Sequence, residues 1–328
     1  MVEQPKFYYK VVPLKLDKIE GGKGFHMRKA RYYVSDSPKA GFKIHPAVVD
    51  ENGKERDFIY LSAFEGSIYD TSGETYLKND EQIADFNTDM LSSIPGAKVA
   101  SGLTQNLIRS NSRLLAENRG DGWMQSYSAS ASLTQMLFAI EYASFNTQEA
   151  IGMGVTRTDN ASELTGKTVS FGNESGEDED SGSVTYRGEE NFWMNMWMFV
   201  DGFNIEAKDI HELYVATHGF EDNIGTEPYQ NAEFTLSKSS GYISAFGYGN
   251  EDYDWLFFPS ETSGNSSVPV GDNFWQNHSY NGWMVVRLGG RWSDGSNGGG
   301  FYWNVYDRSV NRNSGVGCRL VYAPKGGN

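Results

Sequence analysis

Residues 285–323 constrain this chain more than any other stretch, because their composition differs sharply from the rest of the sequence. The segment contains no Lys, Glu, Gln or Met, although the remainder of the chain uses all four. Gly and Trp recur in it between runs of Ser, Asn, Asp, Arg and Tyr, residues that antibody paratopes use to contact their partners. Neither core strands nor adhesive loops alone give a reason for excluding four residue types.

A codon argument does explain the exclusion. When the two adenines of the asparagine codons AAC and AAT are randomised, Lys, Glu, Gln, Met and Trp never arise. Phe, Tyr, Ser, Asp, Gly, Arg, Val, His and Asn all do, and the residues between the Gly and Trp positions fit that set. The Trp positions are then scaffold, and the residues between them are the ones that vary.

The fixed positions of this segment resemble the C-terminal repeat of the variable proteins of diversity-generating retroelements. That repeat reads approximately R-x-G-G-x-W-x-x-G-S-x-x-G-x-F and ends in G-x-R. The matching residues are Arg287, Gly289, Gly290, Trp292, Gly295, Ser296, Phe301, Gly317 and Arg319. Segments 5–9, 41–47, 60–67 and 187–191 also look like the framework of lectin-like tail-fibre tips. The alternative is a Gly-rich core hairpin of another lectin-like domain.

The resemblance implies an α+β fold of the C-type lectin type, elaborated, with short twisted antiparallel sheets and two helices. An aromatic content of 14% and 37 glycines also favour short strands and turns over a helical bundle. Apolar spacing predicts helices over 103–118 and 129–145, with Trp123 in the core between them. Aromatic and β-branched runs predict strands, at 7–12, 31–35, 57–62, 211–217, 241–247, 255–259, 282–288 and 317–322.

Two regions are expected along the chain. Residues 1–75 form an N-terminal β-rich segment, either integrated or a small subdomain, and residues 76–328 form the lectin-like domain with its variable region at about 285–323. Within the second region, the acidic stretch 171–182 has high charge and no apolar anchors, which predicts a mobile surface loop. Its acidic run lacks the ligand order of a calcium-binding loop.

Charge and cysteine content exclude several classes of function. A net charge of −15 argues against nucleic-acid binding and against anionic membranes as partners. No apolar run approaches the roughly 20 residues of a membrane-spanning helix. Cys318 is the single cysteine, and the five histidines show no zinc-binding spacing. We therefore predict no membrane insertion, no metal, no cofactor and no enzymatic activity.

Two alternatives stay open. A tail-associated polysaccharide-degrading enzyme needs only a pair of carboxylates at the right separation, and Asp252, Asp254 and Glu261 lie near aromatic residues. A fixed lectin-like adhesin would share the scaffold without any diversification. Against both, the missing Lys, Glu, Gln and Met favour a displayed, variable surface.

The predicted function is therefore binding to a host cell-surface protein or glycan, by a phage tail-fibre tip in the virion or by a protein on a bacterial cell surface. Gly residues allow tight turns, Trp292, Phe301 and Leu320 fill the core, and the positions between them point outward. Tyr and Arg should supply most of the binding energy, and a homotrimer would add avidity. The candidate contacts are Arg291, Ser293, Asp294, Asn297, Gly299, Tyr302, Tyr306, Asp307, Arg308, Val310, Arg312 and Asn313.

Overall fold

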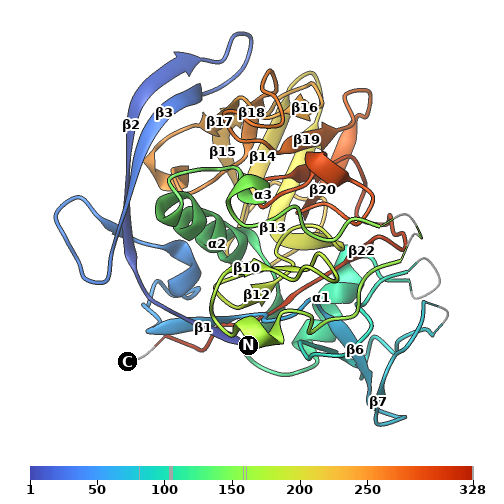
Figure 1. The fold of residues 1–328 in the computed structure, drawn as a ribbon. Helices are drawn as coiled ribbons and strands as arrows, with labels where there is room; N and C mark the ends of the chain where they lie inside the picture. The colour runs from blue at the N-terminus through green and yellow to red at the C-terminus, as the bar shows by residue number, and fades with distance from the viewer. Residues whose placement is uncertain (81, 103–105, 158, 160, 327–328) are drawn as a thin grey trace.

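Twisted, mainly antiparallel sheets with a few helices make up the protein, which is an α+β fold (Figure 1). The computed structural model describes residues 1–80, 82–102, 106–157, 159 and 161–326. Its helices are α1 (Arg109–Glu117), α2 (Ser128–Glu141) and the short α3 (Thr147–Ala150). Single 3-10 turns are η1 (Pro46–Val48), η2 (Val169–Phe171), η3 (Glu251–Tyr253) and η4 (Gly295–Asn297).

The largest sheet carries the variable segment. Its strand order is β15 (Gln230–Thr235), β14 (His211–Val215), β13 (Trp197–Ala207), β20 (Gly282–Leu288), β21 (Trp303–Val305), β19 (Asn273–Gln276) and β16 (Gly241–Tyr242). Strand β22 (Val316–Gly317) adds to β13 in parallel, and β19 pairs with β21 in parallel. Nearly every residue of β13 is buried, because other elements cover both faces of the strand.

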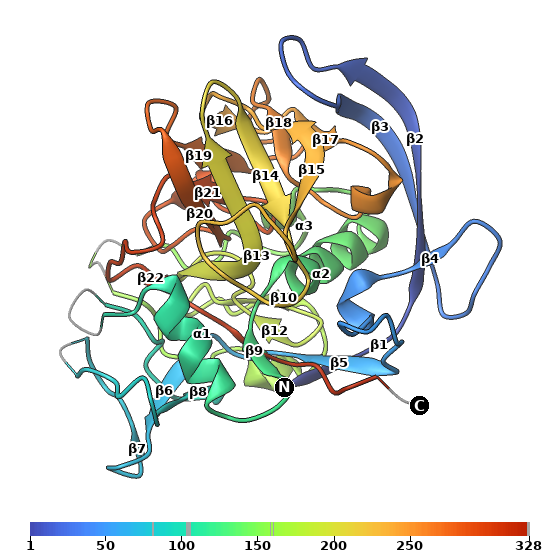
Figure 2. The ribbon, with the colours of Figure 1, turned by 180° about the vertical axis from the view of Figure 1, so that it is seen from behind.

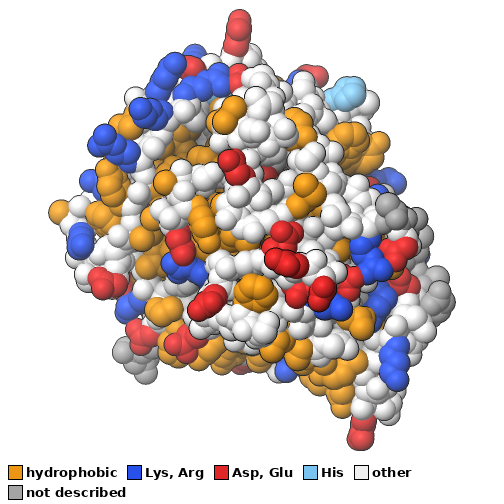
Figure 3. All heavy atoms as spheres, viewed as in Figure 1, with side chains coloured by type: hydrophobic (Ala, Val, Ile, Leu, Met, Phe, Trp, Pro, Cys, Tyr) orange, Lys and Arg blue, Asp and Glu red, His pale blue; other side chains and the backbone are white. Residues whose placement is uncertain are grey.

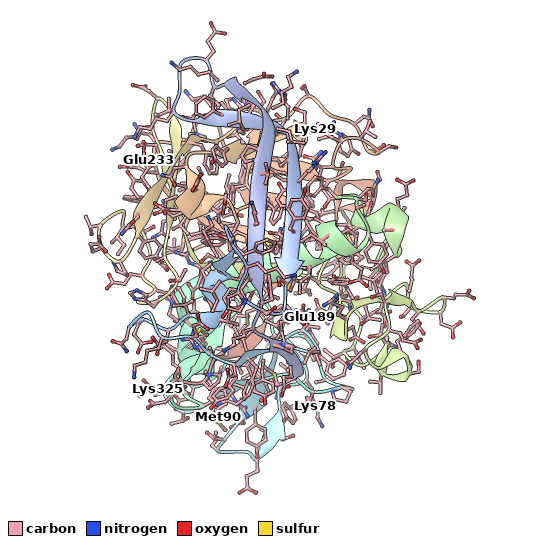
Figure 4. All side chains as sticks on the ribbon, turned by 90° about the vertical axis from the view of Figure 1, so that its left-hand side faces the viewer. Lys29, Lys78, Met90, Glu189, Glu233 and Lys325 are labelled. Carbon is pink, nitrogen blue, oxygen red and sulfur yellow. The ribbon has the colours of Figure 1, made fainter. Side chains whose placement is uncertain are left out.

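A long hairpin lies along one side of the molecule, with α2 between it and the main sheet (Figures 1 and 2). It is formed by β2 (Tyr8–Lys18) and β3 (Phe25–Ser35), within the sheet β18 (Pro259–Glu261)–β17 (Ala245–Tyr248)–β3–β2–β4 (Lys43–Ile44). Figure 4 views the hairpin from outside, with Lys29 on it. Residues 8–35 include seven Lys or Arg and two acidic residues, and basic side chains gather over this hairpin in Figure 3.

A third sheet joins the two ends of the chain. Its order is β1 (Val2–Pro5), β5 (Phe58–Leu61), β23 (Leu320–Tyr322) and β9 (Trp123–Gln125). Two small sheets complete the fold, namely β7 (Thr75–Tyr76)–β6 (Ser67–Asp70)–β8 (Met90–Ser92) and β10 (Gly176–Glu177)–β11 (Val184–Tyr186)–β12 (Glu189–Glu190). Through β5–β23 and β3–β17, strands of residues 1–75 pair directly with strands from the rest of the chain.

Helix α2 lies in the centre of the main hydrophobic core, which extends from Phe7 to Ala323. Its sequence is rich in Ser and Ala, and small side chains allow close packing on all sides. The buried hydroxyls are satisfied by main-chain carbonyls: Ser128 donates to Ala216 O at 2.6 Å, and Ser130 donates to Tyr127 O at 2.9 Å. Because each hydroxyl has an acceptor, burying it costs little.

Both long helices are shorter than predicted. Asn106 has a φ of 55°, in the left-handed region, so the first helix does not run through it and starts at Arg109. The predicted start at 103–105 lies outside the described residues. The second helix ends at Glu141, with Tyr142 as its C-cap, because Ala143 has a φ of 49° in the same left-handed region.

Three other expectations need correction. Residues 255–258 are buried but not a strand, which begins only at Pro259. Trp123 lies on β9 and is half-buried, packed against Tyr322 with ring centroids 4.8 Å apart, and is not enclosed in the core. The predicted loop 171–182 contains β10 and a tight turn in which Asp178 accepts a hydrogen bond from Ser181 N at 2.9 Å.

Candidate ligand-binding surface

A buried polar hub around Arg319 anchors the C-terminal end of the variable segment. The Arg319 guanidinium donates to Glu190 O at 2.6 Å and to Asn191 O at 3.3 Å from one nitrogen, and to Ser62 O at 2.7 Å from another. These partners belong to the segments 60–67 and 187–191, so three stretches that resemble the family framework meet in space. The hub fixes where residues 317–319 lie.

Glu65 is the second member of this hub and is fully buried. Its carboxyl accepts from Asn191 Nδ2 at 3.2 Å and from Asn195 Nδ2 at 2.5 Å. Burial raises the pKa of Glu65 to about 8, although the neighbouring Arg319 opposes the rise. The hub therefore holds a proton that an exposed glutamate would have lost.

The other anchor of the segment is Arg287 on β20, whose side chain is 3% exposed. It forms an ion pair of 2.5 Å with Asp307 and lies over the ring of Phe199, 5.2 Å from its centroid. Burial lowers the pKa of Arg287, and Asp307 opposes that shift. Asp307 is thus a partner of a buried cation, and its proposed role as a free contact needs correction.

The framework predicted beneath the surface is confirmed. Trp292, Phe301 and Leu320 are buried, with Phe301 completely enclosed. Gly289 has a φ of 100°, which only glycine adopts readily, and a Cβ at Gly317 would lie 2.6 Å from Ala100 O. Glycine is therefore required at both positions by the backbone and its neighbours.

The twelve candidate contacts fall into three groups by exposure. The exposed group is Ser293, Asn297, Tyr306, Arg308, Val310 and Arg312. The half-buried group is Arg291, Asp294, Asp307 and Asn313, and the buried group is Gly299 and Tyr302. The first group forms the candidate binding surface.

The prediction that Gly299 and Tyr302 point outward is wrong. Tyr302 is 5% exposed and packs on Trp197, with ring centroids 4.5 Å apart, in a small cluster that also contains Val316. The chain that returns from β21 to β22 covers this side, so both faces of the strand are enclosed. A Cβ at Gly299 would lie 2.1 Å from the buried carboxylate of Asp272, which leaves no room for a side chain.

The half-buried residues other than Asp307 take part in hydrogen bonds within the loops. The carboxylate of Asp294 accepts from Arg291 N at 3.0 Å, which closes the turn after Gly290. Asn313 Oδ1 accepts from Gly315 N at 2.9 Å, which directs the chain back into β22. The side chains of Asp294 and Asn313 are engaged with the backbone, so these two residues contribute first to the geometry of the loops.

Sequence reasoning missed Trp275, which is 47% exposed beside Tyr306, itself 45% exposed. The signal was present in β19, where Phe274 and Gln276 are buried and the alternation of a strand turns Trp275 outward. The two rings lie 6.2 Å apart and line a cleft of about 500 Å³. The cleft borders the candidate surface through Tyr306.

The carboxylates considered for an enzyme are mostly engaged elsewhere. Asp254 is buried, pairs with Lys43 at 2.9 Å and accepts a hydrogen bond from the Tyr9 hydroxyl. Glu261 pairs with Arg28, and that hydrogen bond lowers the pKa of Glu261 to about 2. A carboxyl that stays ionised in this way is a poor general acid. Asp252 is exposed.

Two other features, a metal-binding site and a membrane-spanning helix, are also not found in the part of the chain that the structure describes. No group of three His, Cys, Asp or Glu is placed there to hold a metal ion. No helix among the same residues has the length and apolar character needed to cross a membrane. No protein-family model matches the chain, and no curated protein sequence is significantly similar to it.

Proposed function

We propose that the protein is a ligand-binding protein that displays a variable surface on a C-type lectin-type scaffold, at a phage tail-fibre tip or on a bacterial cell surface. One observation carries this proposal: within one segment, buried anchor residues are interspersed with a group of exposed residues. Arg287, Trp292, Phe301 and Arg319 are buried anchors, whereas the exposed group between them contacts solvent. Exposed residues can change without removing an anchor.

The composition of the exposed group supports the same function. Its members are Ser, Asn, Tyr, Arg and Val, all of which arise from asparagine codons randomised at their adenines. The two tryptophans of the segment, Trp292 and Trp303, cannot arise in this way, and both are buried. These two buried tryptophans are therefore scaffold positions and not products of this variation.

The proposed partner is a protein or glycan on a host cell. Tyr306 and Arg308 are exposed and of the residue types that supply most binding energy at interfaces. A homotrimer would present three copies of the surface and raise the overall affinity through avidity.

The experiment that tests the proposal is to sequence the DNA on either side of the gene. We expect a near-copy of the segment that encodes residues 285–323, beside a reverse-transcriptase gene. The two copies should differ at adenines of the near-copy, in codons for exposed residues such as Tyr306 and Arg308. Absence of a near-copy, or differences concentrated in codons for Trp292 and Phe301, would overturn the proposal and leave a fixed lectin-like adhesin.

A further inference from the structure

The cleft beside Tyr306 has features of a site for a small ligand. It lies between β19, the residue after β21 and the turn 238–240, and it has a volume of about 500 Å³. Volumes in this range are typical of small-molecule sites.

One wall of the cleft is aromatic. Trp275 and Tyr306 are each nearly half exposed, and the planes of their rings differ by only 30°. Two such rings side by side leave apolar surface in water, although the only other exposed aromatic residues of the described chain are Phe25 and Tyr33. Their faces carry negative partial charge, which attracts the positively polarised C–H groups on the flat side of a pyranose ring.

The other walls are polar and held in place. Ser239, Ser240, Asn277, His278 and Ser279 line them and can donate to or accept from hydroxyl groups. Gln276 N donates to Ser240 Oγ at 3.1 Å, and Ser240 Oγ donates to Gln276 O at 3.3 Å. This exchange joins the turn 238–240 to the end of β19, so the cleft exists before a ligand arrives.

The charge of the cleft is opposite to that of the whole protein. The chain has a net charge of −15, yet no Asp or Glu lines the cleft, whereas Lys238 and His278 do. Lys238 is exposed and forms no ion pair within the described part of the chain. Lys238 and His278 both line this one cleft, so both can face the same ligand.

We propose that this cleft binds an acidic saccharide, with a pyranose ring stacked on Trp275 and Tyr306 and its carboxylate directed to Lys238 and His278. The inference rests on the proposed binding function and names the ligand class for this part of the surface. Only Tyr306 of these residues belongs to the variable segment. Trp275, Lys238 and His278 would thus stay constant, whereas variation at Tyr306 and in the rest of the exposed group would adjust the specificity.

The test compares sialyllactose with lactose, which lacks the sialic acid and its carboxylate. Each sugar is titrated into the full chain, and binding is followed by calorimetry and by ligand-observed NMR. We expect sialyllactose to bind with a dissociation constant of about 1 mM or below, and lactose about tenfold more weakly. Trp275→Ala should abolish binding of both sugars. Lys238→Ala should reduce the affinity for sialyllactose to that for lactose.

Tyr33→Ala is the matched control, because Tyr33 is a 41% exposed aromatic on the hairpin and does not line the cleft. It should leave both affinities unchanged. Equal binding of the two sugars, no binding of either, or loss of binding in Tyr33→Ala would each overturn the proposal. Binding of a host protein that Trp275→Ala abolishes, with no sugar binding, would also overturn it and would make the cleft a protein contact. All these results are independent of the DNA flanking the gene, so failure here is distinguishable from failure of the proposed function.

Discussion

At the scale of single residues, Asp307 lies within the proposed variable segment but is needed as the partner of the buried Arg287. The guanidinium is buried and its partner carboxylate is 21% exposed at the rim of the segment. A charge left alone in the interior costs far more than an exposed one. Asp307 therefore cannot be exchanged as freely as its neighbours Tyr306 and Arg308.

We expect Asp307→Ala to lower the free energy of unfolding by about 2–3 kcal/mol, because it leaves Arg287 without its partner. The value lies below that for a fully enclosed pair, since Asp307 reaches solvent. Chemical denaturation measures it, with the exposed Arg308→Ala as control, for which the change should stay within about 0.5 kcal/mol. Equal effects of the two substitutions would show that the ion pair has no structural importance.

Glu65 gives the protein a dependence on pH. Since burial raises the pKa of Glu65 from 4.5 to about 8, the folded protein keeps a proton that the unfolded chain releases above its ordinary pKa. The folded state is therefore favoured at low pH, and this contribution is lost as the pH rises towards about 8, by at most about 1.4 kcal/mol per pH unit.

Glu65→Gln removes this titration and preserves the shape of the side chain. We expect the stability of the original protein relative to the variant to decrease between about pH 5 and about pH 8. Urea denaturation of both proteins across this range measures the difference. A constant difference would show that Glu65 titrates normally in the folded state.

At the scale of elements, a buried aromatic side chain helps to hold the turn between β20 and β21. Trp292 packs in a small cluster with Val99, Val155 and Met196, apart from the main core. The main chain of Trp292 also forms two hydrogen bonds with other segments. Trp292 N donates to Asn195 O at 3.2 Å, and Arg157 N donates to Trp292 O at 2.9 Å. Trp292 is therefore one point of attachment, beside Gly295 O, which accepts from Gln148 Nε2 at 3.0 Å, and Gly300 N, which donates to Thr147 Oγ1 at 2.9 Å.

Trp292→Ala should lower the free energy of unfolding by about 3–5 kcal/mol, as expected for a buried aromatic that leaves a cavity. Ser293→Ala, next to it and exposed, is the matched control and should change little. Thermal and chemical denaturation of both variants check the contrast. If Trp292→Ala is as stable as the control, the division into anchors and variable positions is wrong.

Elements differ in how far sequence could predict them. Strand β20 (Gly282–Leu288) begins and ends where predicted, because an apolar run is bounded by Gly at both ends. The helix ends were missed, because Asn106 and Ala143 adopt a left-handed conformation that neither residue type demands. Tertiary surroundings set both ends.

Prediction from the sequence meets the same limit at the candidate site. Tyr302 and Tyr306 are of one type and four residues apart, yet one is 5% and the other 45% exposed. Alternation along a strand works when one face is open, as for Trp275, and fails at Tyr302, where the chain returning to β22 covers the second face. That cover depends on a distant contact with Trp197, which sequence spacing does not reveal.

At the scale of the whole molecule, the N-terminal segment completes sheets and core that the rest of the chain needs. Tyr60 and Leu61 of β5 pair with β23, and Met27 of β3 pairs with Phe246 of β17. Phe7 lies in the same hydrophobic cluster as Ala323. Removing residues 1–75 would expose strand edges and open this core.

We therefore expect the fragment 76–328 to lack a cooperative unfolding transition, whereas the full chain shows one. Circular dichroism melting and the dispersion of amide NMR signals measure this for both proteins. A fragment lacking only residues 1–5, which removes the edge strand β1, is the control and should keep the transition at a lower temperature. A cooperative melt of 76–328 would make residues 1–75 a separate subdomain.

The sheet that joins β1 to β23 also places both termini on the side of the molecule opposite the cleft. Both strands lie at the lower side of the molecule in Figure 1, whereas β16 and β19, beside the cleft, lie at its upper side. Anything attached to either terminus would therefore extend from this lower side. The strands beside the cleft would then lie on the side away from the attachment.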